Sequence, residues 1–191
     1  MNKRPFIAVS LVLLVAFPLM AEDTLNIDDG IPGIPGNAVS VPVMIDDGSG
    51  LDSFDLMITY DTTLFDLSGA DVSLGTLTSG WSLTHNIDDT TGVAIIGGHN
   101  GAVPLPENTG FGSLFDMSFQ IDENAPLGIS PLVFDGSFSV ISGTFGQEIT
   151  PTLDSGSINV VPEPSSLMLM LIAIGAAPAL LRRRRCRLAN A

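Results

Sequence analysis

Carboxylates are the main chemistry-bearing side chains of this 191-residue chain. Of its 21 Asp and Glu residues, all but Glu163 lie in residues 22–161, a stretch without Lys, Arg or Cys whose only histidines are His85 and His99. A pair of carboxylates can perform acid–base chemistry, as in glycoside hydrolysis, and several together can bind a hard cation such as calcium. Thiol chemistry is excluded in this stretch, and donors for an oxyanion are few.

The sequence gives little support to catalysis. Nothing singles out two carboxylates that face each other across a substrate, and no serine lies in a recognised nucleophile motif. His99, in the run Gly97-Gly98-His99-Asn100-Gly101, is interpreted as a loop residue. We therefore expect no catalytic residue and no enzymatic activity.

Paired aspartates at 28 and 29, 46 and 47, and 88 and 89 are the candidates for a metal site. None fits the calcium-binding loop of EF-hands, and the run from Asn86 to Gly92 places its glycine one residue late. Asp and Gly also form turns, because Asp bonds its own backbone and Gly accepts positive φ. We interpret the pairs as turns and expect no metal and no cofactor; a structural calcium in one of them is the alternative.

The acidic stretch has the apolar periodicity of β-strands. In residues 39–45 the odd-numbered positions are all apolar, and residues 111–121 follow a similar rule with one interruption at Ser113. In residues 53–60 two faces alternate, one made of Phe54, Leu56, Ile58 and Tyr60 and the other of Ser53, Asp55, Met57 and Thr59. No helix-length amphipathic segment occurs, and Gly, Pro, Asn and Asp separate the runs, so an all-β sandwich of seven to nine strands is predicted.

Both ends of the chain carry a basic cluster beside an apolar run. Lys3 and Arg4 precede an apolar stretch through Phe17, which predicts a signal peptide over residues 1–21 with cleavage after Ala21. Residues 165–181 form a second apolar run, roughly 25 Å long as a helix and followed by arginines at 182–185 and 187. Because basic residues beside such runs stay in the cytoplasm, residues 22–161, which we call the body, are expected to be exported. The only cysteine, Cys186, lies in the arginine tail, so the body forms no disulfide.

The C-terminal 30 residues resemble the PEP-CTERM sorting signal of Gram-negative bacteria. Pro162, Glu163 and Pro164 are followed by the apolar segment of residues 165–181 and then by Arg182, Arg183, Arg184 and Arg185. The resemblance implies that residues 162–191 hold the chain in the inner membrane until an exosortase processes it, after which the protein lies at the cell surface or outside the cell. A permanent tail anchor is the alternative.

The body resembles a cohesin domain over nearly its whole length. The matching pieces, in family order, are Gly33-Ile34-Pro35-Gly36-Asn37-Ala38-Val39-Ser40-Val41-Pro42-Val43, Leu51-Asp52-Ser53-Phe54-Asp55-Leu56-Met57-Ile58-Thr59-Tyr60-Asp61, Gly112-Ser113-Leu114-Phe115-Asp116-Met117-Ser118-Phe119, Asn124-Ala125-Pro126-Leu127-Gly128 and Gly156-Ser157-Ile158-Asn159-Val160. The resemblance implies a jelly-roll sandwich of about nine strands, related in fold to carbohydrate-binding modules, that holds a dockerin through one sheet face. The family has an Asn-x-Asp pair where this chain has Ser53 and Asp55, so the second residue fits the pattern and the first departs from it.

These observations predict a secreted, non-catalytic recognition module whose partner-binding residues are Ser53, Asp55, Met57 and Thr59. A body with twenty carboxylates and no basic residue repels nucleic acid and anionic lipid and suits cationic partners. The expected partner is a dockerin-like or other surface protein. A structural matrix or envelope component and a polysaccharide-binding module are the alternatives. Trp81 and Tyr60 are the only residues of their types, and Tyr60 is predicted to point inward, which disfavours an aromatic platform for sugars.

Overall fold

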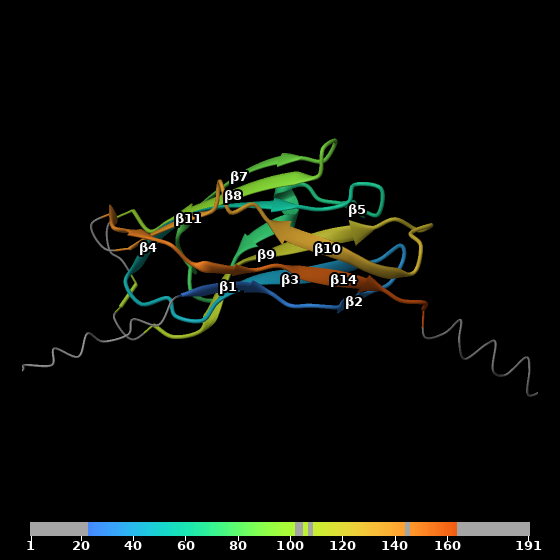
Figure 1. Ribbon diagram of the computed structural model, residues 1–191. Coiled ribbons are helices and arrows are strands. Elements are labelled where there is room, and N and C mark those ends of the chain that lie inside the picture. Colours follow the sequence, from blue (N-terminus) through green and yellow to red (C-terminus); the bar gives the residue numbers. More distant parts are fainter. Residues whose placement is uncertain (1–22, 102–104, 107–108, 144–145, 164–191) are drawn as a thin grey trace, which may run out of the picture.

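The computed structural model describes residues 23–101, 105–106, 109–143 and 146–163. Within them the chain forms two β-sheets around one core, and a short 3-10 helix, η1 (Gly69–Asp71), precedes β6 (Figure 1). The predicted all-β sandwich is confirmed. The signal peptide of residues 1–21 and the apolar segment of residues 165–181 lie outside the described residues.

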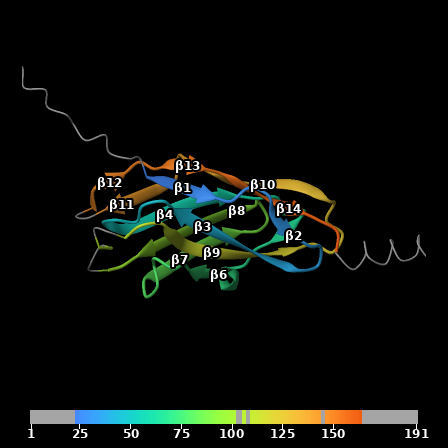
Figure 2. The same cartoon turned by 90° about the horizontal axis from the view of Figure 1, so that it is seen from below.

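The first sheet has the strand order β13-β1-β3-β9-β5, and β6 also pairs with β9. Its strands are β1 (Thr24–Ile27), β3 (Ala38–Ile45), β5 (Phe65–Asp66), β6 (Val72–Leu74), β9 (Gly112–Ile121) and β13 (Thr152–Asp154). The longest pairing joins β3 and β9, which run antiparallel from Ala38 opposite Gln120 to Ile45 opposite Gly112. This pairing forms the middle of the first sheet (Figure 2).

The second sheet is built around β4, with β8 and then β7 on one side and both β10 and β11 on the other. Its strands are β2 (Ile31–Gly33), β4 (Leu51–Thr59), β7 (Ser82–Asp88), β8 (Val93–His99), β10 (Gly128–Phe134), β11 (Val140–Gly143), β12 (Glu148–Ile149) and β14 (Gly156–Val160). Beyond β10 the sheet continues through β14 to β2, and β12 pairs with β11. Most of the strands predicted from the alternation are present, but several are interrupted.

Two of the interruptions close one side of the sandwich. The first strand divides into β1 and β2, and the last divides into β13 and β14, so that each passes from the first sheet to the second. The two divided strands cross between the sheets side by side, since β1 pairs in parallel with β13 in the first sheet and β2 pairs in parallel with β14 in the second. Ser157 Oγ joins them by donating to Asp29 Oδ1 at 3.0 Å and accepting from Gly30 N at 2.9 Å.

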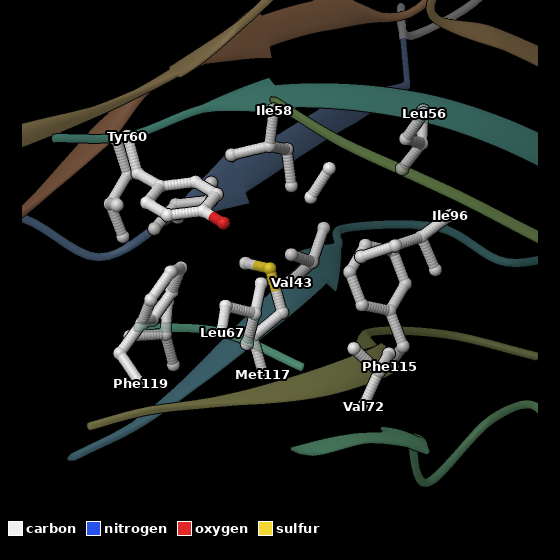
Figure 3. Close-up of a cluster of buried hydrophobic side chains, with 14 of the residues drawn as sticks. Val43, Leu56, Ile58, Tyr60, Leu67, Val72, Ile96, Phe115, Met117 and Phe119 are labelled. Carbon is white, nitrogen blue, oxygen red and sulfur yellow. The ribbon is translucent and has the colours of Figure 1, made fainter. Parts of the chain in front are cut away.

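The core lies between β4 and β8 of the second sheet and β3 and β9 of the first. Leu56, Ile58 and Tyr60 point from one side towards Phe115, Met117 and Phe119 on the other (Figure 3). Each buried side chain of this size contributes about 1.5–3 kcal/mol relative to its exposed state. Since residues 5–181 contain no Lys or Arg, apolar burial has to provide most of the stability of the body.

Aromatic contacts join the two sheets inside this core. The Phe54 ring lies between Trp81, with centroids 6.2 Å apart, and Phe115, with centroids 5.5 Å apart. At the other end Tyr60 meets Phe119 edge-on at 5.2 Å, and its hydroxyl donates to Asp89 at 2.9 Å. Burial, followed by this hydrogen bond, raises the pKa of Tyr60 above its usual range. The predicted inward face of residues 54–60 is therefore confirmed.

Adjacent glycines in β8 test the core and the outer surface separately. A Cβ on Gly98 would lie 2.5 Å from Cε1 and Cζ of Phe54, whose ring is held between two others, so Gly98→Ala should lower the free energy of unfolding by about 1–3 kcal/mol. A Cβ on Gly97 would instead meet the ends of two side chains on the solvent side, Asp55 Oδ1 at 2.3 Å and Thr84 Oγ1 at 2.9 Å. Gly97→Ala should change that free energy by less than about 0.5 kcal/mol. Urea unfolding followed by Trp81 fluorescence measures both, and equal losses would contradict the assignment of the two faces.

Candidate functional site

The outer surface of the second sheet is the candidate site, because it carries the residues predicted to bind a partner. Ser53, Asp55, Met57 and Thr59 lie on β4 between buried Phe54, Leu56 and Ile58, so their side chains face solvent. We call this surface the β4 face. It consists of these four residues and the outward residues of β7, β8, β10 and β11 that lie beside them.

The strand register arranges the β4 face in rows. Each predicted residue of β4 lies opposite one residue of β8, and each of those lies opposite one of β7. The rows are Ser53, His99 and Ser82; Asp55, Gly97 and Thr84; Met57, Ile95 and Asn86; and Thr59, Val93 and Asp88. On the other side of β4, Val140 lies opposite Asp55 and Val133 opposite Thr59. Ser142 of β11 lies opposite Ser53. The β7 side of the face is therefore polar, whereas the β10 and β11 side places a valine beside Asp55 and another beside Thr59.

Gly97 determines how Asp55 lies on this face. Its missing side chain leaves room for the Asp55 carboxylate, whose Oδ1 occupies a position 2.3 Å from where a Cβ would be. The carboxylate is thereby directed across β8 towards Thr84. Sequence reasoning identified Asp55 but not Gly97, because a glycine in a strand gives no sign of the neighbour that lies over it.

A turn at residues 135–139 adds an apolar element beside β4. Phe134 lies opposite Ile58, and Val140 lies opposite Asp55. Phe134 and Val140 are six positions apart in the sequence, whereas their partners on β4 are only three positions apart. The extra residues form the turn, and Phe138 within it is 63% exposed. Sequence reasoning missed Phe138 and Val140, although Asp135-Gly136 was available as a turn signal.

His99 is not a loop residue, as the sequence suggested, but the last residue of β8. The glycines around it favoured a loop interpretation, yet Gly97 and Gly98 are accommodated in the strand because Asp55 and Phe54 lie over them. His99 is exposed and lies opposite Ser53 and Ser82, at one end of the β4 face.

The paired aspartates organise turns and connections. Asp47 and Asp88 accept hydrogen bonds from backbone N–H groups two or three residues ahead. Side-chain hydrogen bonds from Ser49 to Asp47 and from Thr91 to Asp88, followed by these backbone bonds, hold the pKa of both carboxyls below the usual range. Asp89 accepts from Tyr60 and from Leu67 N, and Asp46 accepts from Thr24 N at 2.7 Å. In the part of the chain that the structure describes, no group of three or more His, Cys, Asp or Glu residues is placed to hold a metal ion.

Two other carboxyls lie in less favourable surroundings. Burial raises the pKa of Asp23, and the nearby Asp47 and Asp46 carboxylates raise it further. Burial alone raises the pKa of Asp116, which lies on the outward side of β9 opposite Pro42 and Ser73. Both lie outside the β4 face, so they affect stability rather than the candidate site.

The raised pKa of Asp116 predicts a pH-dependent gain from its replacement. A carboxyl whose pKa is raised in the folded state favours folding only while it is protonated, and this contribution is lost as the pH rises through its folded pKa. At pH 7 the ionised Asp116 therefore opposes folding, and Asp116→Asn should raise Tm; the advantage should shrink as the pH falls towards about 4. Asp88→Ala should instead lower Tm at pH 7, because hydrogen bonds in the turn lower the pKa of Asp88 and so stabilise its ionised form in the folded state. Thermal unfolding of both variants from pH 4 to pH 7 measures this, and a pH-independent difference for Asp116→Asn would contradict it.

The arrangement of the two sheets agrees with the family comparison. The Cohesin domain family matches residues 27–160, which include the entire β4 face. The chain belongs to the cohesin family. Cohesins are non-catalytic protein-interaction modules, and residues 27–160 of this chain form such a module. The comparison with curated proteins found no significant match.

Solved cohesin structures share the fold. A non-cellulosomal cohesin from the archaeon Archaeoglobus fulgidus superimposes with a TM-score of 0.62 at 19% identity, covering 78% of this chain and 97% of that one. A cohesin from Clostridium acetobutylicum gives 0.62 at 26% identity, with 73% and 91% covered. A third similar structure is a type I cohesin–dockerin complex from Clostridium thermocellum, with a TM-score of 0.63, 21% identity and coverage of 74% and 100%.

The PEP-CTERM protein-sorting motif matches residues 160–185. This match indicates export with a membrane-anchoring sorting signal, followed by a location at the surface. The motif follows the last strand directly, since β14 ends at Val160 and Val161 N still donates to Gly33 O at 2.8 Å. Among the described residues no helix is long and apolar enough to cross a membrane, and the predicted span at residues 165–181 lies outside them.

Proposed function

We propose that this cohesin module binds a protein at the cell surface through the β4 face, with a dockerin-like or other surface protein as its partner. The observation that carries the proposal is the composition of that face. An exposed carboxylate, Asp55, is surrounded by the partly exposed apolar side chains of Met57, Ile95 and Val140. A surface of this kind favours a partner that offers apolar contact together with positive charge.

The roles of the four predicted residues follow from their places in the rows. Asp55, directed over Gly97, offers a carboxylate to a partner cation, and Met57 offers apolar contact beside Ile95. Ser53 and Thr59 lie at the two ends of the stripe and provide hydroxyl groups at its rim. No step of this binding requires a cofactor.

Export and anchoring form the second part of the proposal. The signal peptide takes the body across the inner membrane, residues 165–181 hold it there, and an exosortase then processes the segment that begins at Pro162. Processing places the β4 face outside the cell, where a secreted or surface partner can reach it.

A structural matrix component and a polysaccharide-binding module remain the rival functions. The only tryptophan, Trp81, and the only tyrosine, Tyr60, are both 7% exposed, so neither ring is available at the surface to stack against a sugar. This burial favours a protein partner over a polysaccharide.

Replacing Asp55 tests the proposed face. The immobilised body should retain a specific protein from the secreted fraction of the same culture, and Asp55→Lys should weaken that binding more than about tenfold, because it places like charges at the contact. Asp66→Lys is the matched control, since Asp66 is also exposed but lies on β5 of the first sheet. Affinity is measured by surface plasmon resonance with the retained protein. Equal effects of the two variants would move the site to another face, and retention of polysaccharide alone would favour the rival function.

Mass spectrometry tests the proposed processing. The mature protein from an exosortase-bearing host should lack the residues before Glu22 and the arginine tail, because both are removed during export and sorting. Deleting the exosortase gene should leave the tail attached. Recovery of surface material that still contains Arg187 from the unmodified host would contradict the proposal.

A further inference from the structure

Exposed apolar side chains are distributed unequally over the sandwich. Seven large apolar residues of the described chain are exposed. Ile95, Ile129, Val133 and Val140 lie on strands of the second sheet, Phe138 lies in the connection between β10 and β11, and Leu127 immediately precedes β10. Five of these six, all except Ile95, lie on β10 or β11 or in the segments next to them, rather than on the β7 side. Exposed apolar groups that gather on one surface mark an interaction site more reliably than scattered ones.

The turn at residues 135–139 presents the largest of these groups. Asp135 organises the turn, since its Oδ1 accepts from Ser137 N at 2.8 Å and its carbonyl accepts from the N–H groups of Phe138 and Ser139. The turn is also held to β4 at both of its ends. Asp135 N donates to Met57 O at 2.8 Å, and Met57 N donates to Ser139 Oγ at 3.4 Å. Phe138 is thus 63% exposed on a hydrogen-bonded turn beside Met57.

We infer that Phe138, together with Val140, Met57 and Ile95, is the main contact for the partner, and that the partner contributes a protein segment in which a large apolar side chain is flanked by Lys or Arg. This inference rests on the proposed function and names the partner's chemistry at the same face. A turn that is already held by hydrogen bonds loses little backbone conformational entropy on binding, and Phe is among the residues enriched at protein interfaces.

Charge complementarity favours a basic protein segment over a second copy of the body or an anionic membrane. The body contains no Lys or Arg, so a Lys or Arg that pairs with Asp55 or Asp135 has to come from the partner. A second copy of the body would bring two acidic surfaces without Lys or Arg together, and an anionic membrane would be repelled in the same way. A basic protein segment with a large apolar side chain can pack that side chain on the apolar patch and pair its positive charge with the carboxylates.

A displayed peptide library tests the inference even while the natural partner is unidentified. The probe is a phage library of random 15-residue peptides with equal numbers of acidic and basic codons, selected on the body and washed at physiological ionic strength. Recovered peptides should carry a large apolar residue flanked by Lys or Arg. Their affinity should fall more than about tenfold on Phe138→Ser, because the main apolar contact is lost.

Phe111→Ser is the matched control, since Phe111 is 69% exposed but precedes β9 of the first sheet. It should change affinity less than about twofold, and circular dichroism should show that both variants stay folded. Peptides that bind Phe138→Ser as well as the unchanged body, or that lack basic residues, would overturn the inference. Binding that depends equally on Phe111 would also overturn it.

The same variants separate this inference from the proposed function. If a secreted protein is retained by the β4 face but is insensitive to Phe138→Ser, protein recognition stands and the inference fails. If no secreted protein is retained while binding of the peptides requires Phe138, the proposed function fails, but the inferred preference for an apolar side chain flanked by Lys or Arg is supported. Vesicles of phosphatidylethanolamine and phosphatidylglycerol should not bind the body, and vesicle binding that is lost on Phe138→Ser would assign the turn to a membrane instead.

Discussion

The packing of β4 against β9 is the interaction on which the rest of this structure depends. The body has no disulfide and no basic residue, so neither a covalent link nor an intradomain Lys or Arg ion pair can hold its sheets together. Its carboxylates repel one another more strongly in the compact state than in the unfolded chain. The contacts of Phe54 with Phe115 and of Tyr60 with Phe119 therefore have to offset both the chain entropy and this repulsion.

The same strand supplies the core and the candidate site. Side chains on a β-strand alternate, so the burial of Phe54, Leu56 and Ile58 fixes the outward direction of Asp55 and Met57. A slip of β4 by one residue would place the carboxylate of Asp55 in the core, at a large cost in desolvation. The register that stabilises the fold thus also determines which groups a partner meets, and the glycine pair in β8 serves both sides of the sheet.

Local alternation explains what could be predicted from the sequence. It identified the inward face of residues 54–60, the outward stripe from Ser53 to Thr59 and the all-β class, because each depends on neighbours within one strand. Phe138, Val140 and His99 could not be placed in this way. Their positions depend on which strand lies beside β4 and on three residues looped out between β10 and β11, and these are properties of pairing between distant segments.

The absence of basic residues has a consequence for survival outside the cell. Trypsin-like proteases recognise Lys or Arg in a pocket that carries an aspartate, and no such residue occurs between Arg4 and Arg182. Even a fully unfolded body therefore presents no bond that this class of protease can cleave. For most exported domains resistance to digestion is a property of the fold, whereas for this one, against this class of enzyme, it is a property of composition that persists when the fold is lost.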